Sequence, residues 1–174
     1  MNDKKRQNLG KDCAYIGVFV ALTIAAQLCL SFLPGVEVVT VLFVAFSFVF
    51  GCRRGIAAAT AFSLIRQLVF GFFPTVLVLY LVYYNLLALL FGFLGRWGKL
   101  TPKKVVWLTA VACICTVCFT MLDNIITPLW YGYSGRVFRL YFYASFSVMI
   151  PQVICTAVSV GILMYPLVKI FQKL

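Results

Sequence analysis

The class of this protein is decided by the segment 37–70, EVVTVLFVAFSFVFGCRRGIAAATAFSLIRQLVF. It holds two apolar runs, which are separated by the short basic sequence Cys52-Arg53-Arg54-Gly55. Consecutive apolar runs with positive residues between them are typical of helices that cross a membrane in succession. The segment therefore predicts two membrane-spanning helices, 37–51 and 55–70, whose connection carries two arginines.

The rest of the chain repeats this pattern. Of its 174 residues, 64% are hydrophobic and 11% are charged, and the mean hydropathy is +1.04. A soluble domain has only about half apolar residues. We expect an all-α integral membrane protein with one membrane domain, 1–174, built as a six-transmembrane-helix bundle. The predicted helices are 13–33, 37–51, 55–70, 75–94, 105–126 and 141–170.

The basic residues predict the orientation of the bundle. The chain has 15 Lys and Arg against 4 Asp and Glu. Positive residues concentrate in cytoplasmic connections, and twelve of the fifteen fall on one side of the predicted spans: Lys4, Lys5, Arg6, Lys11, Arg53, Arg54, Arg96, Lys99, Lys103, Lys104, Lys169 and Lys173. We therefore expect a multi-pass protein of the cell membrane with both termini cytoplasmic. The orientation in the membrane then accounts for the excess of positive residues, and we do not expect nucleic acid as a partner.

Three charged residues are predicted to lie at a similar depth in the outer half of the membrane. Arg66 follows Arg54 by twelve residues, or roughly 18 Å at about 1.5 Å per residue. Asp123 lies nineteen residues beyond Lys104, and Glu37 opens the second span from the outer side. Charged groups inside a membrane are costly unless they face protein or water. They predict a small pocket open to the outside, or a pair between Arg66 and Asp123 that only holds two helices together.

Other polar and aromatic residues extend this candidate substrate-binding site. They are Asn124, Tyr84, Trp130, Tyr131 and Gln152. Buried polar groups require partners, and aromatic rings can stack on a flat ligand. For the outer aromatic residues, an interfacial belt is the ordinary alternative.

The first span carries Gly17, Ala21 and Ala25 at four-residue spacing. Such a row of small residues lets another helix approach closely. It predicts either a docking face for a second membrane subunit or packing within the bundle.

Motifs for enzymatic chemistry are absent from the sequence. It has no histidine, no Walker A motif, no H-E-x-x-H and no G-x-S-x-G. Its seven cysteines lie almost wholly in apolar runs, where cysteine acts as a small apolar residue. We expect no enzyme activity, no metal site and no cofactor. Active transport by this chain would need another subunit to supply the energy.

Several features together resemble the substrate-binding S component of energy-coupling factor (ECF) transporters. They are six predicted helices in a chain of this length, the Pro34-Gly35 turn, the run 41–55 ending in Phe50-Gly51-Cys52-Arg53-Arg54-Gly55, and Ala21-x-x-x-Ala25. The resemblance covers nearly the whole chain. It implies a subunit that binds a vitamin or related micronutrient in an outward-facing pocket, with the loop between the first two helices as a lid.

The resemblance also implies partners. Ala21 and Ala25 would dock the subunit on a membrane coupling subunit that two cytoplasmic ATPases drive. The nickel and cobalt members use an N-terminal histidine-containing metal site, and this sequence has no histidine, so a metal-ion substrate is not expected. The alternative function is a stand-alone secondary carrier or small channel that uses Asp123 as a proton-linked carboxylate. A membrane enzyme acting on lipids is a third possibility, for which the sequence offers no acidic or nucleophilic cluster.

Overall fold

All regular structure in the part of the chain that the structure describes is helical. The computed structural model describes residues 3–32, 38–98 and 100–173. The long helices are α1 (Asp3–Leu30), α2 (Val39–Phe70), α3 (Pro74–Leu94), α4 (Pro102–Tyr131) and α5 (Gly135–Phe171), and a short 3-10 helix, η1 (Gly95–Trp97), follows α3. Within these described ranges, five helices are long and apolar enough to cross a membrane. The expected all-α class is confirmed for these residues, and the helices have the length and composition that an integral membrane protein needs.

The helix α2 covers residues 39–51 of the first span predicted in 37–70 and the whole of the second. It is interrupted at Gly51 alone, where φ is 80° and ψ is 175°. Glycine reaches a positive φ without the penalty that a side chain brings. The basic sequence after Gly51 is therefore not a connecting loop, as predicted, but the first turn of a second helical arm. We call residues 39–50 the first arm of α2 and residues 52–70 its second arm.

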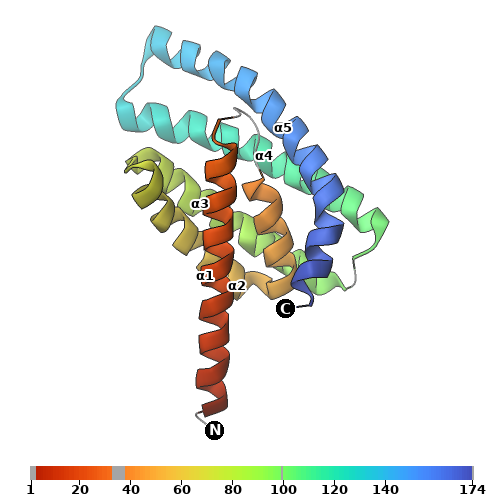
Figure 1. Cartoon of the computed structure of the whole chain (residues 1–174). Helices are drawn as coiled ribbons and strands as arrows, with labels where there is room; N and C mark the ends of the chain where they lie inside the picture. The colour runs from red at the N-terminus through yellow and green to blue at the C-terminus, as the bar shows by residue number, and fades with distance from the viewer. Residues whose placement is uncertain (1–2, 33–37, 99, 174) are drawn as a thin grey trace.

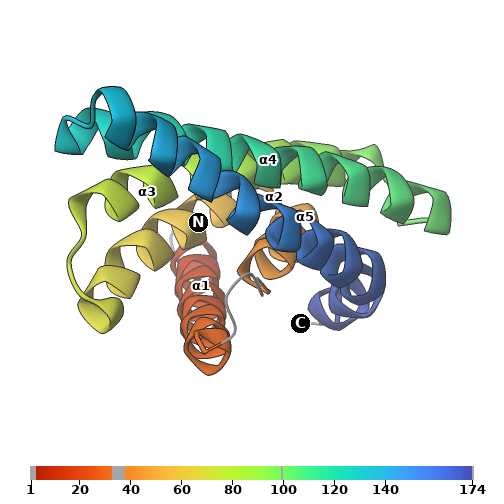
Figure 2. The same cartoon turned by 90° about the horizontal axis from the view of Figure 1, so that it is seen from above.

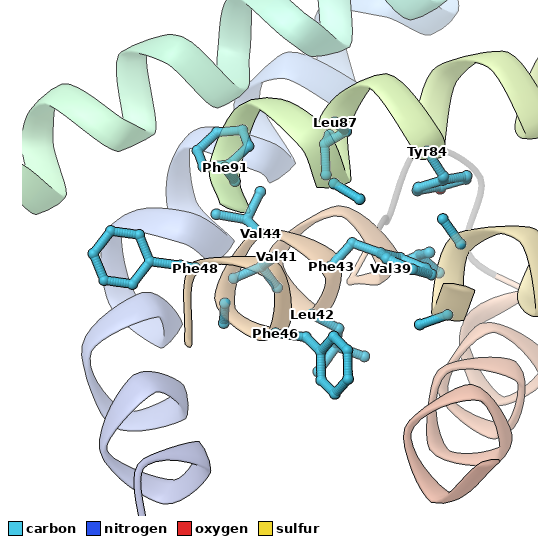
Figure 3. Close-up of a cluster of buried hydrophobic side chains, with 14 of the residues drawn as sticks. Val39, Val41, Leu42, Phe43, Val44, Phe46, Phe48, Tyr84, Leu87 and Phe91 are labelled. Carbon is cyan, nitrogen blue, oxygen red and sulfur yellow. The ribbon is translucent and has the colours of Figure 1, made fainter. Parts of the chain in front are cut away.

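The first arm of α2 forms the centre of the core. Every residue from Val39 to Phe48 is buried, as expected of a helix that is apolar all round. Figure 3 shows its side chains packed against α3. The ring of Phe46 also stacks on Phe19 of α1, with 4.0 Å between ring centroids. The arm is thus enclosed by protein on several sides.

Two glycines let the end of α3 lie directly against the kink in α2. A Cβ atom at Gly92 would stand 2.5 Å from the backbone nitrogen of Cys52, and one at Gly95 would overlap the carbonyl oxygen of Phe48. Gly55 approaches Ser47 and Ala88 in the same way. Small residues at such positions permit close helix contact inside a membrane.

Helix boundaries differ from the predicted ones mainly where polar residues continue a helix. The helix α1 begins at Asp3 rather than at residue 13, because Lys, Arg and Gln are good helix formers outside the apolar run. The predicted outer connection 127–139 is almost entirely helical. Only residues 132–134 separate α4 from α5, and Gly132 ends α4 in the left-handed conformation.

The described ends of the chain lie toward one end of the bundle, and the hairpin between α4 and α5 lies at the other (Figure 1). Seen from above, α4 and α5 run across the bundle while α1 is viewed along its axis (Figure 2). The guanidinium of Arg54 binds the carboxylate of Asp12 at 2.7 Å, and the Lys104 amine donates to the carbonyl of Trp97 at 2.7 Å. We call the end that holds Asp12, Arg53, Arg54, Arg96 and Lys104 the basic end.

Candidate functional site

A cavity of about 230 Å³ lies between α4 and α5, away from the basic end. We call it the α4–α5 cavity. Its lining combines one carboxylate, several hydroxyl and amide groups, and two aromatic rings. The residues are Phe119, Thr120, Asp123, Tyr141, Ala144, Ser145, Val148 and Gln152. A small apolar pocket with a few polar groups is the usual form of a small-molecule site.

Asp123 is the charged residue of this cavity. The side chain of Thr127 donates to its Oδ1 at 2.7 Å, and the hydroxyl of Tyr141 donates to its Oδ2 at 2.6 Å. Thr127 lies one turn further along α4, whereas Tyr141 belongs to α5. A carboxylate offers about four lone-pair positions. The two bonds orient the group and leave it able to accept further hydrogen bonds from a ligand.

Asn124 lies beside Asp123 and is 4% exposed. Its Oδ1 accepts a hydrogen bond of 2.7 Å from Ser145 of the cavity lining. Its Nδ2 atom is buried and has no hydrogen-bond partner. A buried donor without a partner costs free energy. Asn124 is not among the residues that line the cavity, and its contact with the lining is the hydrogen bond from Ser145.

Arg66 does not line the α4–α5 cavity. Its Nε donates to Oε1 of Gln27 at 3.1 Å, and its guanidinium lies 4.5 Å from the ring centroid of Tyr80 and 4.7 Å from that of Phe70. Among the residues that the structure describes, Arg66 and Asp123 do not pair with each other. Both predictions for this arginine, a substrate contact and an ion pair across the helices, therefore lack support.

Aromatic rings nevertheless connect Arg66 with the cavity. The ring of Tyr80, below the guanidinium, lies 5.9 Å from that of Phe119, which lines the cavity. The ring of Tyr83 lies 4.7 Å from the same phenylalanine. The wall between Arg66 and the cavity thus consists of packed rings, and the arginine supports this wall from the far side.

The remaining predicted site residues lie in different surroundings. Gln152 lines the cavity, but Tyr84 is 2% exposed and packs in the aromatic core, 4.8 Å from Phe43. Trp130 and Tyr131 are 57% and 52% exposed at the end of α4, as residues of an interfacial belt would be. Glu37 and the expected lid, 34–36, lie outside the described residues.

The predicted site left out several lining residues, above all Tyr141, which counted only as one of the outer aromatic residues, and Ser145. Their signal was the spacing of Tyr141, Ser145, Val148 and Gln152, which are four, three and four residues apart. That spacing puts them on one face of a helix, and two of them carry a hydroxyl group. Phe119 and Thr120 had no distinguishing sequence signal.

The row Gly17, Ala21 and Ala25 is exposed on α1. The bundle instead contacts the opposite face of this helix, where Phe19 and Thr23 are buried. Packing within the described chain thus leaves the small residues uncovered, and a second helix could lie against them.

Comparisons with known proteins do not name a relative for this architecture. No family model, no curated protein and no solved structure matches the chain.

Proposed function

We propose that this chain is the substrate-binding subunit of a multi-subunit, ATP-driven importer of a micronutrient, either a vitamin or a related small heterocycle. The observation that carries the proposal is the α4–α5 cavity, whose lining combines the Asp123 carboxylate with the aromatic rings of Phe119 and Tyr141. This combination suits a flat, polar molecule of small size. The resemblance to ECF S components leads to the same function from the sequence.

The charge of the cavity narrows the ligand class. Among the described residues, Asp123 is the one charged side chain in its lining, and Arg66 is engaged elsewhere. A carboxylate in a membrane is costly without a positive partner. The proposed ligand therefore carries a cationic group, or several N–H donors, toward Asp123.

In the proposed topology, both arms of α2 cross the membrane, so the chain crosses it six times. The basic end faces the cytoplasm, because positive residues are retained on that side. The α4–α5 cavity then opens toward the outer half. The first arm of α2 tolerates its short length because protein rather than lipid encloses most of it.

Energy for import would come from partner subunits. The sequence has no nucleotide-binding motif, so the proposal assigns ATP hydrolysis to two cytoplasmic ATPases and motion to a membrane coupling subunit. The exposed row on α1 is the proposed docking face.

Binding by the purified chain is the direct test of this function. A panel of vitamins is measured by calorimetry against the wild type, Asp123→Asn and Asp12→Asn. We expect one cationic or N–H-rich member to bind, and Asp123→Asn to weaken it roughly tenfold or more, because a hydrogen bond to a charged group contributes about 1.5–3 kcal/mol. Asp12→Asn removes the same charge at the basic end and should not change the affinity. Full affinity in Asp123→Asn, or no binding by any compound, would contradict the proposal.

Docking is tested separately with Ala21→Leu. We expect ligand binding by the purified variant to survive while ATP-dependent uptake by cells fails, because the larger side chain prevents close helix approach. Ala110→Leu changes an exposed alanine on α4 and should leave uptake intact. Unchanged uptake in Ala21→Leu would remove this row from the docking face.

A stand-alone carrier that uses Asp123 is the competing proposal. It requires transport by the purified chain in liposomes without ATP or partner subunits. Such transport, abolished by Asp123→Asn, would favour the carrier and count against the importer subunit.

A further inference from the structure

A second cavity lies at the basic end, where the kink in α2 meets the end of α3. Residues 48–53 of α2 form one wall, and Gly92, Gly95 and Arg96 form the other. Its volume is about 430 Å³. We call it the Gly51 groove. Gly92 and Gly95 line it at the place where they lie directly against the backbone of Cys52 and Phe48.

The Gly51 groove is strongly positive. Arg53 and Arg96 line it from opposite walls, and both side chains are exposed. Among the described residues neither has a carboxylate partner, whereas their neighbour Arg54 pairs with Asp12. The N-terminal turn of the second arm of α2 also lines the groove and contributes a partial positive charge. Two guanidinium groups in this setting favour a phosphate, which they can bind through paired hydrogen bonds.

The surroundings of the groove match the boundary between lipid headgroups and acyl chains. Trp97 and Trp107 are 61% and 49% exposed and stack beside it at 6.1 Å. Tryptophan is enriched at this level of a membrane. On α3, the exposed apolar residues Phe93, Leu89 and Leu86 continue from Arg96 along one face. Acyl chains attached to a phosphate in the groove could therefore lie along this apolar face of α3.

We propose that the Gly51 groove binds the phosphate-bearing headgroup of an anionic phospholipid, with Arg53 and Arg96 as its two cationic contacts. The acyl chains would lie along the exposed face of α3. Basic pockets between helices at the cytoplasmic side are suited to such headgroups. The lipid would link α2 to α3 at the point where Gly51 interrupts the helix. This site is separate from the α4–α5 cavity and does not depend on the proposed transport function.

The test measures lipid retention by the full chain in a neutral detergent. Native mass spectrometry counts bound phosphatidylglycerol and phosphatidylcholine for the wild type, for Arg53→Gln with Arg96→Gln, and for Arg136→Gln with Arg139→Gln. The last pair is a charge-matched control, because both arginines are exposed in the first turn or two of α5, at the opposite end of the bundle. Melting in phosphatidylcholine vesicles checks that both double variants remain folded.

We expect the wild type to retain phosphatidylglycerol in preference to phosphatidylcholine. The Arg53/Arg96 variant should bind phosphatidylglycerol at least roughly tenfold more weakly than the wild type, and the control variant should bind it about as well as the wild type. Inorganic phosphate should not displace the lipid, because it lacks the apolar chains. Equal retention by both double variants would overturn the site. Displacement by inorganic phosphate would also overturn it, since the groove would then bind a free anion rather than a lipid.

Discussion

A single methyl group at Gly95 should destabilise this protein, whereas the same group at Gly161 should not. The Cβ of an alanine at position 95 would overlap the carbonyl oxygen of Phe48, and that atom belongs to the buried first arm of α2. A backbone atom cannot rotate away, so α3 and α2 must separate. At Gly161, in the middle of α5, no atom lies within 4 Å of the added Cβ.

The size of the effect follows from the cost of overpacking. Forcing an extra methyl group into a packed contact costs about 1–3 kcal/mol. For a chain of this length, each kcal/mol changes the melting temperature by roughly 2–4 °C, so Gly95→Ala should melt about 2–12 °C lower. Gly161→Ala should melt at the wild-type temperature or slightly higher, because alanine is favoured over glycine in a helix by about 0.5–1 kcal/mol.

Thermal unfolding in one detergent, followed by tryptophan fluorescence and by the loss of helical circular dichroism, measures both variants. Agreement between the two signals checks that unfolding is a single transition. If Gly95→Ala melted at or above the wild-type temperature, α3 would not lie as close to the kink in α2 as described. The wall of the Gly51 groove that Gly95 forms would then also be wrongly described.

Three further substitutions test individual contacts by the same melting measurement. Arg66→Gln should cost about 1 kcal/mol through the lost contact with Tyr80 and leave ligand affinity unchanged; an affinity loss would return Arg66 to the site. Asp12→Asn should cost no more than about 1 kcal/mol, since its ion pair is partly exposed, and a larger loss would contradict this. Thr156→Val should cost about 1 kcal/mol by removing the buried bond to Thr116; no loss would argue against that bond.

Hydropathy predicted those parts of the fold that depend on transfer of apolar runs out of water. The helix α3 shows this best, because its predicted range, 75–94, differs from the observed Pro74–Leu94 by one residue. Hydropathy was wrong about the hairpin at 132–134, since it marks where apolar residues become fewer and not where a helix ends, which here is at Gly132 in the left-handed conformation. It also could not show that Gly51 alone interrupts α2.

The candidate site was predictable only in part. Asp123 and Gln152 stood out because placing a polar side chain inside a membrane costs free energy unless it faces protein or water. Both line the α4–α5 cavity. Arg66 stood out for the same reason but lies behind a wall of rings. Counting residues along a helix gives depth in the membrane, and it does not give the neighbour that a side chain faces.

Local composition was enough to predict that the described chain is helical and suited to a membrane, and that most of its positive residues lie on one side of the predicted spans. These properties follow from local composition, because each apolar helix satisfies its own backbone hydrogen bonds, and lipid can cover its apolar surface without a specific neighbour. The packing of the helices was needed to show that Asp123 contacts Tyr141, that Arg66 contacts Tyr80, and that the row on α1 is exposed. The rotation of each helix about its axis is set by how closely its neighbours can pack, as at Gly95, and that contact joins residues far apart in the chain.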